Sequence, residues 1–404
     1  MRQKLTVITI LVLVVGVVVA GSSAPVAAEE TAEKEALMKV FTHPPDRRKD
    51  LFAESFLDQV PINNINNIIA QYKSNLGELE SIKSGEGPYT LIFEKGTAPS
   101  RVSMDSEGRI AGLWFGNWTL KSDTLDKLVS ELKDLDSSVS LYLSKNGEEL
   151  YSLNSEAKMA VGSTFKLYVL QALYDKFESD VWNKVVWLKR KDISLPTGIL
   201  QDWPVGTPVT VKTLSNLMIS QSDNTATDIL IDLVGKKYLE QNTNPRNRPF
   251  LDTVEAFNLK YGVDSATRKD YITGNVKQKR EILESFQGLR VSSKQVTAST
   301  PTLIEEVEWF FSTEELASII YDLRGANEIY INPGLATKSD WYRAGYKGGS
   351  EGGVLQYTHL LQKSNNSPVY VISLTANNPE KGLNTSKITE ITSRLIALIK
   401  DGKL

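Results

Sequence analysis

The stretch Ser163-Thr164-Phe165-Lys166 opens a strongly apolar run over residues 165–177 (FKLYVLQALYDKF), and the rest of the chain is organised around it. The run predicts a buried helix, and a serine and a lysine three residues apart project from the same helical face. Gly162, just before them, lets another backbone or a ligand approach closely. Burial disfavours charged lysine, so the pKa of Lys166 can fall until it accepts a proton near neutral pH. A serine hydroxyl needs such a neighbour to become a nucleophile, which makes this stretch the candidate active centre.

The same Ser-x-x-Lys pattern occurs a second time, in Ser155-Glu156-Ala157-Lys158. This copy lies in a polar turn between a strand and the helix, where we expect both side chains to be solvated. A pattern this short matches often by chance. It therefore carries meaning only when further motifs accompany it.

The composition excludes several classes of function. The chain has 404 residues, 41% hydrophobic and 24% charged, with a formal net charge of −3 that argues against a nucleic-acid partner. The absence of cysteine rules out a disulfide scaffold, a lipid-modified cysteine and a thiolate nucleophile. The two histidines, His43 and His359, are too few for a histidine-ligated zinc site and argue against a histidine base. We therefore expect neither a metal nor another cofactor.

Residues 1–28 are typical of a secretory signal. Arg2 and Lys4 form a positive segment, residues 5–20 an apolar core, and Val26-Ala27-Ala28 a small-residue cleavage site. The alternative is an uncleaved membrane anchor, but the apolar core is short for a spanning helix, which needs about 20 residues. No later segment is long and apolar enough to span a bilayer. The sequence therefore predicts a secreted, periplasmic or cell-envelope protein.

Residues 29–122 predict a small first domain of helices followed by a curled sheet. The expected helices cover residues 33–40, 50–60 and 62–76, and the expected strands cover residues 89–94, 101–105 and 109–114. No acid and base are paired in this region. We expect a cone of the α+β class without its own catalytic site.

Residues 123–404 predict a second α+β domain, with strands at both ends and helices between them. The expected strands cover residues 138–144, 149–153, 341–346, 353–361 and 369–375, and the expected helices residues 165–177, 210–219, 225–233, 313–323 and 388–400. The polar stretches 242–248 and 262–293 show no clear pattern. One antiparallel sheet built from both ends, flanked by helices and with an inserted all-helical lobe, accounts for this order. A cleft between lobe and sheet is the natural place for a site.

The first accompanying motif is Ser222-Asp223-Asn224, between two expected helices. A loop serine there can relay a proton, and an asparagine amide can hold a substrate carbonyl through its NH₂ group. The alternative is that the triplet only caps the helix over residues 225–233. Upstream, residues 194–203 resemble a rim segment and carry no chemistry that the residues themselves indicate.

The second motif is Lys347-Gly348-Gly349-Ser350, which follows an expected strand. A lysine beside glycines places a positive charge next to open backbone, which suits a substrate carboxylate. The Ser350 N–H and the Ser163 N–H together can form an oxyanion hole. The alternative is an ordinary hairpin turn.

These three motifs, in this order, resemble those of the penicillin-recognising serine hydrolases, specifically class A β-lactamase-like proteins. The resemblance covers about residues 124–404. The first domain resembles the ketosteroid-isomerase-type (NTF2-like) cone that is fused to such hydrolases in a two-domain subfamily. That subfamily includes the β-lactamase-like protein of the clavulanic acid pathway, so the resemblance implies esterase chemistry as much as β-lactam cleavage. It does not imply an isomerase activity.

The chain departs from the family pattern at two points. Gly348 stands where a hydroxyl-bearing residue is usual, so one carboxylate contact is missing unless Ser350 supplies it. Class A enzymes also carry a Glu-x-x-x-Asn loop whose glutamate activates the hydrolytic water. Here Glu255 is followed by Asn258, one position too early for that pattern. Efficient penicillin hydrolysis is therefore not expected.

The leading hypothesis is a secreted serine hydrolase, an esterase or weak β-lactamase acting on a small ester or β-lactam-like substrate. The catalytic residues are expected to be Ser163, Lys166, Ser222 and Lys347, and the substrate-binding residues Asn224, Gly349 and Ser350. One alternative is a D-alanyl carboxypeptidase or transpeptidase acting on cell-wall peptide, and another is a catalytically silent cell-envelope binding module. A third is an α/β-hydrolase, because residues 348–352 fit Gly-x-Ser-x-Gly, although that motif must join a strand to a helix.

Overall fold

The computed structural model describes residues 26–84, 88–195, 197–286, 288–296 and 299–404. The expected signal over residues 1–28 lies outside these ranges except for its last three residues, with which helix α1 (Val26–Thr42) begins. In the part of the chain that is described, no helix combines the length and apolar composition that crossing a membrane requires.

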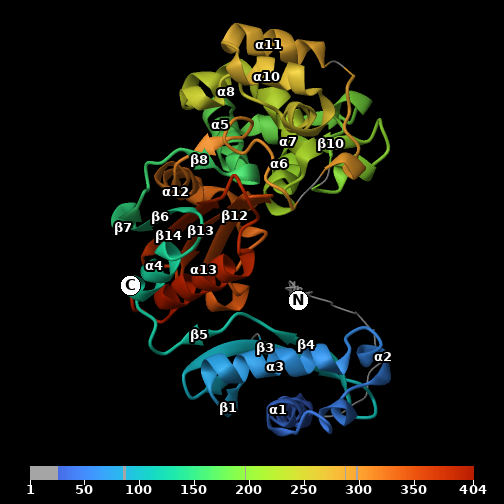
Figure 1. Cartoon of the computed structure of the whole chain (residues 1–404), viewed down its shortest axis with the longest axis vertical. Coiled ribbons are helices and arrows are strands. Elements are labelled where there is room, and N and C mark those ends of the chain that lie inside the picture. The colour runs from blue at the N-terminus through green and yellow to red at the C-terminus, as the bar shows by residue number, and fades with distance from the viewer. Residues whose placement is uncertain (1–25, 85–87, 196, 287, 297–298) are drawn as a thin grey trace. The chain divides into compact units, whose positions relative to one another are not determined.

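The chain forms two compact units (Figure 1). Unit 1 is the described part of Met1–Ser130 together with Thr389–Leu404, and unit 2 is Glu131–Ile388. Helices α4 (Leu125–Lys133) and α13 (Thr385–Lys400) both run across this division. The expected domain limits at residues 29–122 and 123–404 therefore stay predictions.

Unit 1 is an α+β structure in which helices precede a sheet. Its further helices are η1 (Arg48–Leu51), α2 (Glu54–Leu57) and α3 (Ile62–Leu76), and its strands are β1 (Leu79–Lys83), β2 (Tyr89–Phe93), β3 (Gly96–Met104), β4 (Ile110–Phe115) and β5 (Thr119–Leu120). The strands pair antiparallel in the order β1-β2-β3-β4, and β5 pairs with β3. Buried aromatic rings fill the space between helices and sheet, with Phe41 in edge contact with both Phe93 and Phe115.

The single helix expected over residues 50–60 is wrong. The chain leaves the helix after η1 because Phe52 and Ala53 turn extended and meet β4. Phe52 bridges to Ile110, and the Ala53 N–H donates to the Ile110 carbonyl at 2.9 Å. Pairing with a distant strand overrides the local helical pattern here.

Unit 2 is built on a five-stranded antiparallel sheet in the order β12-β13-β14-β6-β7 (Figure 1). The strands are β6 (Ser138–Lys145), β7 (Glu148–Leu153), β12 (Arg343–Glu351), β13 (Val354–Gln362) and β14 (Val369–Asn377). The pairing of β14 with β6 joins the late strands to the early ones. The predicted sheet, made from both ends of this region, is confirmed.

The helical lobe lies between β7 and β12 in the sequence. Its helices are α5 (Lys166–Lys176), α6 (Val211–Ser220), α7 (Asn224–Val234), α8 (Lys236–Asn242), α9 (Thr253–Phe257), α10 (Ser265–Thr273) and α11 (Val276–Ser285). Helix α12 (Thr313–Asp322) packs on β6, β13 and β14. Two short ribbons, β8 (Met159–Ala160) with β11 (Phe310–Phe311) and β9 (Val185–Trp187) with β10 (Pro208–Thr210), complete the unit.

Helix α5 lies at the centre of the unit 2 core. Leu167, Val169, Leu170 and Leu173 are fully buried, so the helix is enclosed on several faces, as its apolar sequence predicts. Burying one such side chain contributes roughly 1.5–3 kcal/mol compared with an exposed position. The start of α5 is therefore firmly held, which matters because the Ser-x-x-Lys stretch leads into it.

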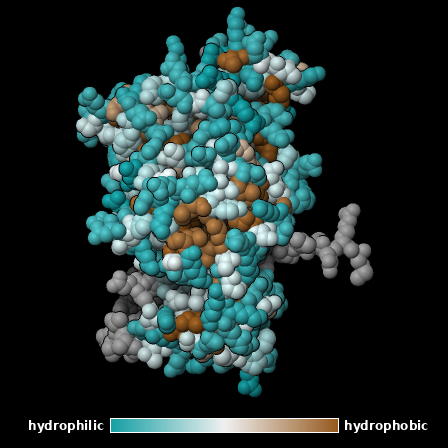
Figure 2. All heavy atoms as spheres, turned by 90° about the vertical axis from the view of Figure 1, so that its left-hand side faces the viewer, coloured by the Kyte–Doolittle hydropathy of each residue, from teal (hydrophilic) through white to brown (hydrophobic). Residues whose placement is uncertain are grey.

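On the face drawn in Figure 2, hydrophilic side chains cover most of the surface and apolar ones gather mainly in one patch.

Candidate active site

Ser163 lies on a tight turn that precedes the buried helix. Residues Gly162–Phe165 form the 3-10 helix η2, and α5 begins at Lys166. The neighbours of Ser163 point inward: Thr164 donates to the Gln356 Oε1 at 2.7 Å, and the Phe165 ring stacks on Trp309 at 3.9 Å. Ser163 itself is only half-buried. The turn thus presents one hydroxyl outward from a rigid base.

Lys166 is fully buried and surrounded by neutral partners. Its ammonium donates to the Ser222 carbonyl at 2.7 Å, to the Ser222 Oγ at 3.2 Å and to the Asn224 Oδ1 at 2.6 Å. Burial lowers the pKa of Lys166 to about 7, and the nearby carboxylates of Asp228 and Asp223 raise it only in part. Among the described contacts, no hydrogen bond joins Lys166 to the Ser163 hydroxyl. Such bonds often tighten only when substrate is bound.

Lys347 meets the same serine from the sheet. Its ammonium donates to the Ser222 Oγ at 3.1 Å and to the Gly348 carbonyl at 2.5 Å, and it is 3% exposed. Burial lowers the pKa of Lys347 well below its ordinary value, and the charge of Lys166 lowers it further. Because the Ser222 oxygen accepts from two lysines, its own O–H remains available to donate a proton.

The loop at Ser222 is held in an unusual conformation by the rim segment. Ser222 has a φ of +54°, which a non-glycine residue adopts only when its surroundings impose it. The Thr197 hydroxyl donates to the Ser222 carbonyl at 2.6 Å, and the Thr197 carbonyl accepts from the Asn224 N–H at 3.0 Å. The Asn224 Nδ2 donates to the Leu195 carbonyl at 3.0 Å. Sequence reasoning gave this segment no role, but it positions two of the predicted site residues.

Asp223 connects the helix cap to that segment. Its carboxylate accepts from the Ala226 N–H at 2.8 Å, which caps α7, and from the N–H groups of Ile199 and Leu200 at 2.7 and 2.9 Å. Gly198 leaves room for this contact, since a Cβ there would lie 2.3 Å from the Asp223 carboxylate. The triplet therefore serves both alternatives raised by the sequence, with Asp223 as the cap and its two neighbours at the site.

Strand β12 passes directly beside the nucleophile turn. A Cβ on Gly349 would lie 2.1 Å from the Val161 carbonyl oxygen and 2.7 Å from the Ser163 nitrogen. A Cβ on Gly162, whose φ is +48°, would lie 3.3 Å from the Ser350 nitrogen. Only glycine permits this approach. It brings the Ser163 and Ser350 backbone nitrogens into one small region, where two N–H groups can receive an oxyanion.

The hairpin-turn and α/β-hydrolase alternatives for this motif are wrong. Residues 347–350 lie inside β12, paired in register with β13, so that Lys347 faces Thr358 and Ser350 faces Leu355. The strand is longer than the expected residues 341–346 because this pairing continues as far as Glu351 opposite Val354. After Ser350 the chain turns into another strand, whereas a nucleophile elbow requires a helix.

His359 is the histidine of unit 2, and it is buried within β13. Its Nε2 accepts from the Leu335 N–H at 3.1 Å, and within the described residues its Nδ1 has no hydrogen-bond partner. Burial lowers the pKa of His359 to about 3, so the ring is neutral near pH 7. Among the described residues, no group of three or more histidine or acidic side chains could hold a metal ion.

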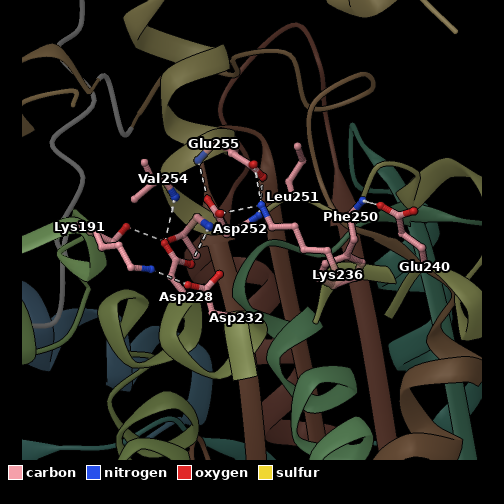
Figure 3. Close-up of polar contacts among 12 residues, drawn as sticks. Lys191, Asp228, Asp232, Lys236, Glu240, Phe250, Leu251, Asp252, Val254 and Glu255 are labelled. Carbon is pink, nitrogen blue, oxygen red and sulfur yellow. Dashed lines mark hydrogen bonds and ion pairs between the residues drawn. The ribbon is translucent and has the colours of Figure 1, made fainter. Parts of the chain in front are cut away.

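Glu255, the residue nearest to the glutamate of the family pattern, is engaged elsewhere (Figure 3). It closes a capping box by accepting from the Asp252 N–H at 3.0 Å, and it pairs with Lys236 at 2.5 Å. Burial and the charge of Asp252 raise the pKa of Glu255 to about 7, although Lys236 lowers it in part. The contacts described for it reach none of the residues around Lys166.

Asp228 is a buried acid that the sequence analysis missed. It follows Asn224 by one helical turn on α7 and accepts from the Thr253 N–H at 2.7 Å, the Thr253 hydroxyl at 2.8 Å and the Val254 N–H at 3.2 Å (Figure 3). Burial raises the pKa of Asp228 well above its ordinary value. The four-residue spacing from Asn224 is the signal that could have revealed it.

Comparison with known proteins gives a partial match. Residues 121–266 match the family model described as the Beta-lactamase enzyme family. This range contains the Ser163 and Ser222 motifs and ends before Lys347. It supports a relationship to the penicillin-recognising serine hydrolases. A search of curated proteins found no match.

Several solved structures are similar to part of the chain. A β-lactamase from Sphaerobacter thermophilus DSM 20745 is 17% identical, with 70% of this chain and 98% of that chain covered and a TM-score of 0.47. A β-lactamase from Chitinophaga pinensis DSM 2588 is 15% identical, with 69% and 98% covered and a TM-score of 0.46. The protein PBP-A is 15% identical, with 69% and 97% covered and a TM-score of 0.43.

Proposed function

We propose that unit 2 is a secreted serine hydrolase that works through an acyl-enzyme on Ser163, of the esterase or weak β-lactamase type. The observation that carries this proposal is the buried Lys166, which has a pKa of about 7 and neutral partners, next to the Ser163 turn. An amine in this state is neutral often enough at pH 7 to accept a proton. Export rests on the signal-like residues 1–28.

The acylation step uses each site residue in a separate role. The Ser163 oxygen attacks the substrate carbonyl carbon while Lys166 accepts the hydroxyl proton. The negative charge that develops on the carbonyl oxygen is stabilised by the N–H groups of Ser163 and Ser350. As the bond to the leaving group breaks, Ser222 gives its proton to that group, and the Lys347 ammonium beside it restores the proton.

Substrate binding relies on the open edge next to β12. Asn224 keeps an amide hydrogen beyond the one bound to Leu195, and this hydrogen can hold a substrate carbonyl. Gly349 keeps the strand close to Ser163. Gly348 offers no hydroxyl to a substrate carboxylate, and the exposed Ser350 supplies one instead. A small ester or a β-lactam-like ring fits these requirements.

Covalent labelling tests this proposal. The purified protein is exposed to a fluorophosphonate probe and to a fluorescent penicillin, and the modified peptide is identified by mass spectrometry. We expect the adduct on Ser163 and its loss in Ser163→Ala. Ser155→Ala is the matched control, because it removes the serine of the other Ser-x-x-Lys copy and should label normally. An adduct that persists in Ser163→Ala contradicts the proposal.

A D-alanyl carboxypeptidase or transpeptidase is the second candidate. The engagement of Glu255 with Lys236 and Asp252 favours it, because such an enzyme has no need of the family's deacylation glutamate. Release of D-alanine from a cell-wall pentapeptide, lost in Ser163→Ala, identifies this activity. Ester turnover above the Ser163→Ala background excludes the silent binding module.

We also propose that unit 1 is an NTF2-like cone. The whole chain would then belong to the two-domain subfamily that includes the protein of the clavulanic acid pathway. The α+β order of unit 1 supports it. Expression of the chain with and without residues 1–28, followed by fractionation, tests the export.

A further inference from the structure

Unit 2 contains a second cluster of buried charges beside the nucleophile turn. Lys260 pairs with Glu308 at 2.6 Å and with Glu351 at 2.5 Å. The side chains of Lys260 and Glu308 are 3% and 1% exposed, whereas that of Glu351 is 22% exposed. Glu351 is therefore the one member of this cluster that solvent reaches to a substantial degree.

The strand β12 places this cluster on the same face as the active-site residues. Side chains two apart on a strand point to the same side, so Lys347, Gly349 and Glu351 share one face. Lys347 contacts Ser222 and Gly349 abuts Ser163, while Glu351 contacts Lys260 of the lobe. Glu351 thus lies on the same face as Lys347 and Gly349, about 7 Å beyond Gly349 along the strand, whereas Lys347 precedes Gly349.

The segment that carries Glu308 also connects with the nucleophile turn. Glu308 accepts from the Trp309 N–H at 3.1 Å, and the Trp309 carbonyl accepts from the Val161 N–H at 3.1 Å. Trp309 stacks on Phe165. Two independent elements, β12 and the segment at residues 308–309, therefore bring the cluster close to Ser163.

The charges of the cluster do not balance, because one ammonium faces two carboxyl groups. Burial and the neighbouring Glu308 raise the pKa of Glu351 well above its ordinary value, and Lys260 lowers it only in part. Burial alone lowers the pKa of Lys260, but the two glutamates more than reverse this. Tyr261 is a further titratable group that faces the cluster. The Glu351 carboxylate, held beside Glu308, is therefore a stronger base than an ordinary glutamate.

We propose that Glu351 is the base that activates water for hydrolysis of the acyl-enzyme, with Lys260 and Glu308 holding it in place. This inference rests on the proposed acyl-enzyme on Ser163. A water molecule between Glu351 and the ester gives a proton to the carboxylate, and its oxygen bonds to the acyl carbon. The intermediate then breaks the bond to the Ser163 oxygen, which regains a proton from Lys166, and the acyl group leaves as a carboxylic acid that keeps the second proton of the water. Glu351 releases its proton to solvent, and Lys347 regains from solvent the proton that it gave up during acylation.

The test separates acylation from deacylation. Unaltered protein, Glu351→Gln and Glu255→Gln are acylated with a fluorogenic ester, and intact-mass spectrometry follows the decay of the adduct. Glu255→Gln is the matched control, because Glu255 is also a buried glutamate paired with a lysine. We expect Glu351→Gln to acylate within about threefold of the unaltered rate and to deacylate about 10²-fold more slowly. Glu255→Gln should keep the unaltered rate of decay.

Several outcomes overturn the inference. Decay of the adduct at the unaltered rate in Glu351→Gln does so, and so does a slow decay confined to Glu255→Gln. If Glu351→Gln fails to fold, the pH dependence of decay in the unaltered protein decides. The decay must slow as pH falls through a group that titrates above the ordinary carboxylate range, and a rate independent of pH from 5 to 8 contradicts the inference.

Chemical rescue distinguishes a base from a merely structural residue. Formate or azide added to Glu351→Gly should accelerate adduct decay at least tenfold, since a small anion replaces the missing carboxylate. Absence of rescue in a folded, acylated variant counts against the inference. The proposed function fails separately, because its failure appears as a lack of Ser163 acylation in the unaltered protein.

Discussion

The two Ser-x-x-Lys copies have the same spacing, but their lysines have different surroundings. Ser155 is half-buried, as Ser163 is, but Lys158 is 34% exposed and pairs with Glu315, which is 37% exposed on α12. Ser163 lies on the turn that enters the buried helix, and Lys166 has no exposed surface and only neutral hydrogen-bond partners. The comparison teaches that the motif sets the distance between hydroxyl and amine, whereas burial sets the reactivity of the amine.

The largest expected effect comes from removing the buried amine. Lys166→Met keeps an unbranched side chain, one atom shorter, but takes away the proton acceptor, so we expect the second-order rate of Ser163 labelling to fall by about 10²–10⁴-fold. Stopped-flow fluorescence with an ester or penicillin probe measures this rate.

Lys158→Met provides the control for that experiment. It breaks an exposed ion pair worth about 0–1 kcal/mol and should leave labelling unchanged. Equal rates in both variants would show that the burial of Lys166 is irrelevant to the chemistry.

A smaller effect is expected from the close approach of β12 to the Ser163 turn. Gly349→Ala places a methyl group against the Val161 carbonyl and the Ser163 nitrogen, so the strand must move away. We expect acylation to fall about 10- to 100-fold, because one oxyanion donor is displaced, and the free energy of unfolding to fall by about 1–3 kcal/mol.

Gly325→Ala is the matched substitution for Gly349→Ala. A Cβ at Gly325 meets nothing within 4 Å, so this change should affect neither quantity. Urea unfolding and labelling kinetics measure both variants. Normal acylation in a stable Gly349→Ala protein would argue against the backbone oxyanion hole.

The smallest expected effect is the change in the rate of acylation over one pH unit. The folded pKa of Lys166 is lowered to about 7, so the neutral, proton-accepting form is lost as pH falls below that value. The labelling rate should therefore decline towards tenfold per pH unit on the acid side of pH 7. A rate that stays constant from pH 8 to pH 5 would contradict the role of Lys166 as the base.

Much of the fold of unit 2 could be predicted because its signals are local. The apolar run 165–177 predicts a buried helix, and α5 is one. Alternating strands at the two ends of the region predict a single sheet, and the register of β14 with β6 confirms it. Helices α10 and α11 were not predicted, because they carry few apolar residues and begin at the capping side chains of Asp264 and Asn275.

The supporting contacts of the site could not be predicted because they join distant segments. The carboxylate of Asp223 binds backbone groups of Ile199 and Leu200, more than twenty residues earlier in the chain. Lys260 meets Glu351 across ninety-one residues. No local sequence pattern indicates contacts between residues so far apart. Only the residue types of Lys166, Ser222 and Lys347, in their order, pointed to a common site.

His359 shows how this protein must respond to acidity. With the ring locked neutral down to about pH 3, unit 2 cannot use imidazole as its proton switch near neutrality. Proton transfer in unit 2 therefore depends on Lys166, whose pKa is lowered by burial, and on Glu351, whose pKa is raised by burial. Reagents that modify histidine should consequently spare the chemistry of this unit, whereas cyanate, which carbamylates neutral amines, should inhibit it.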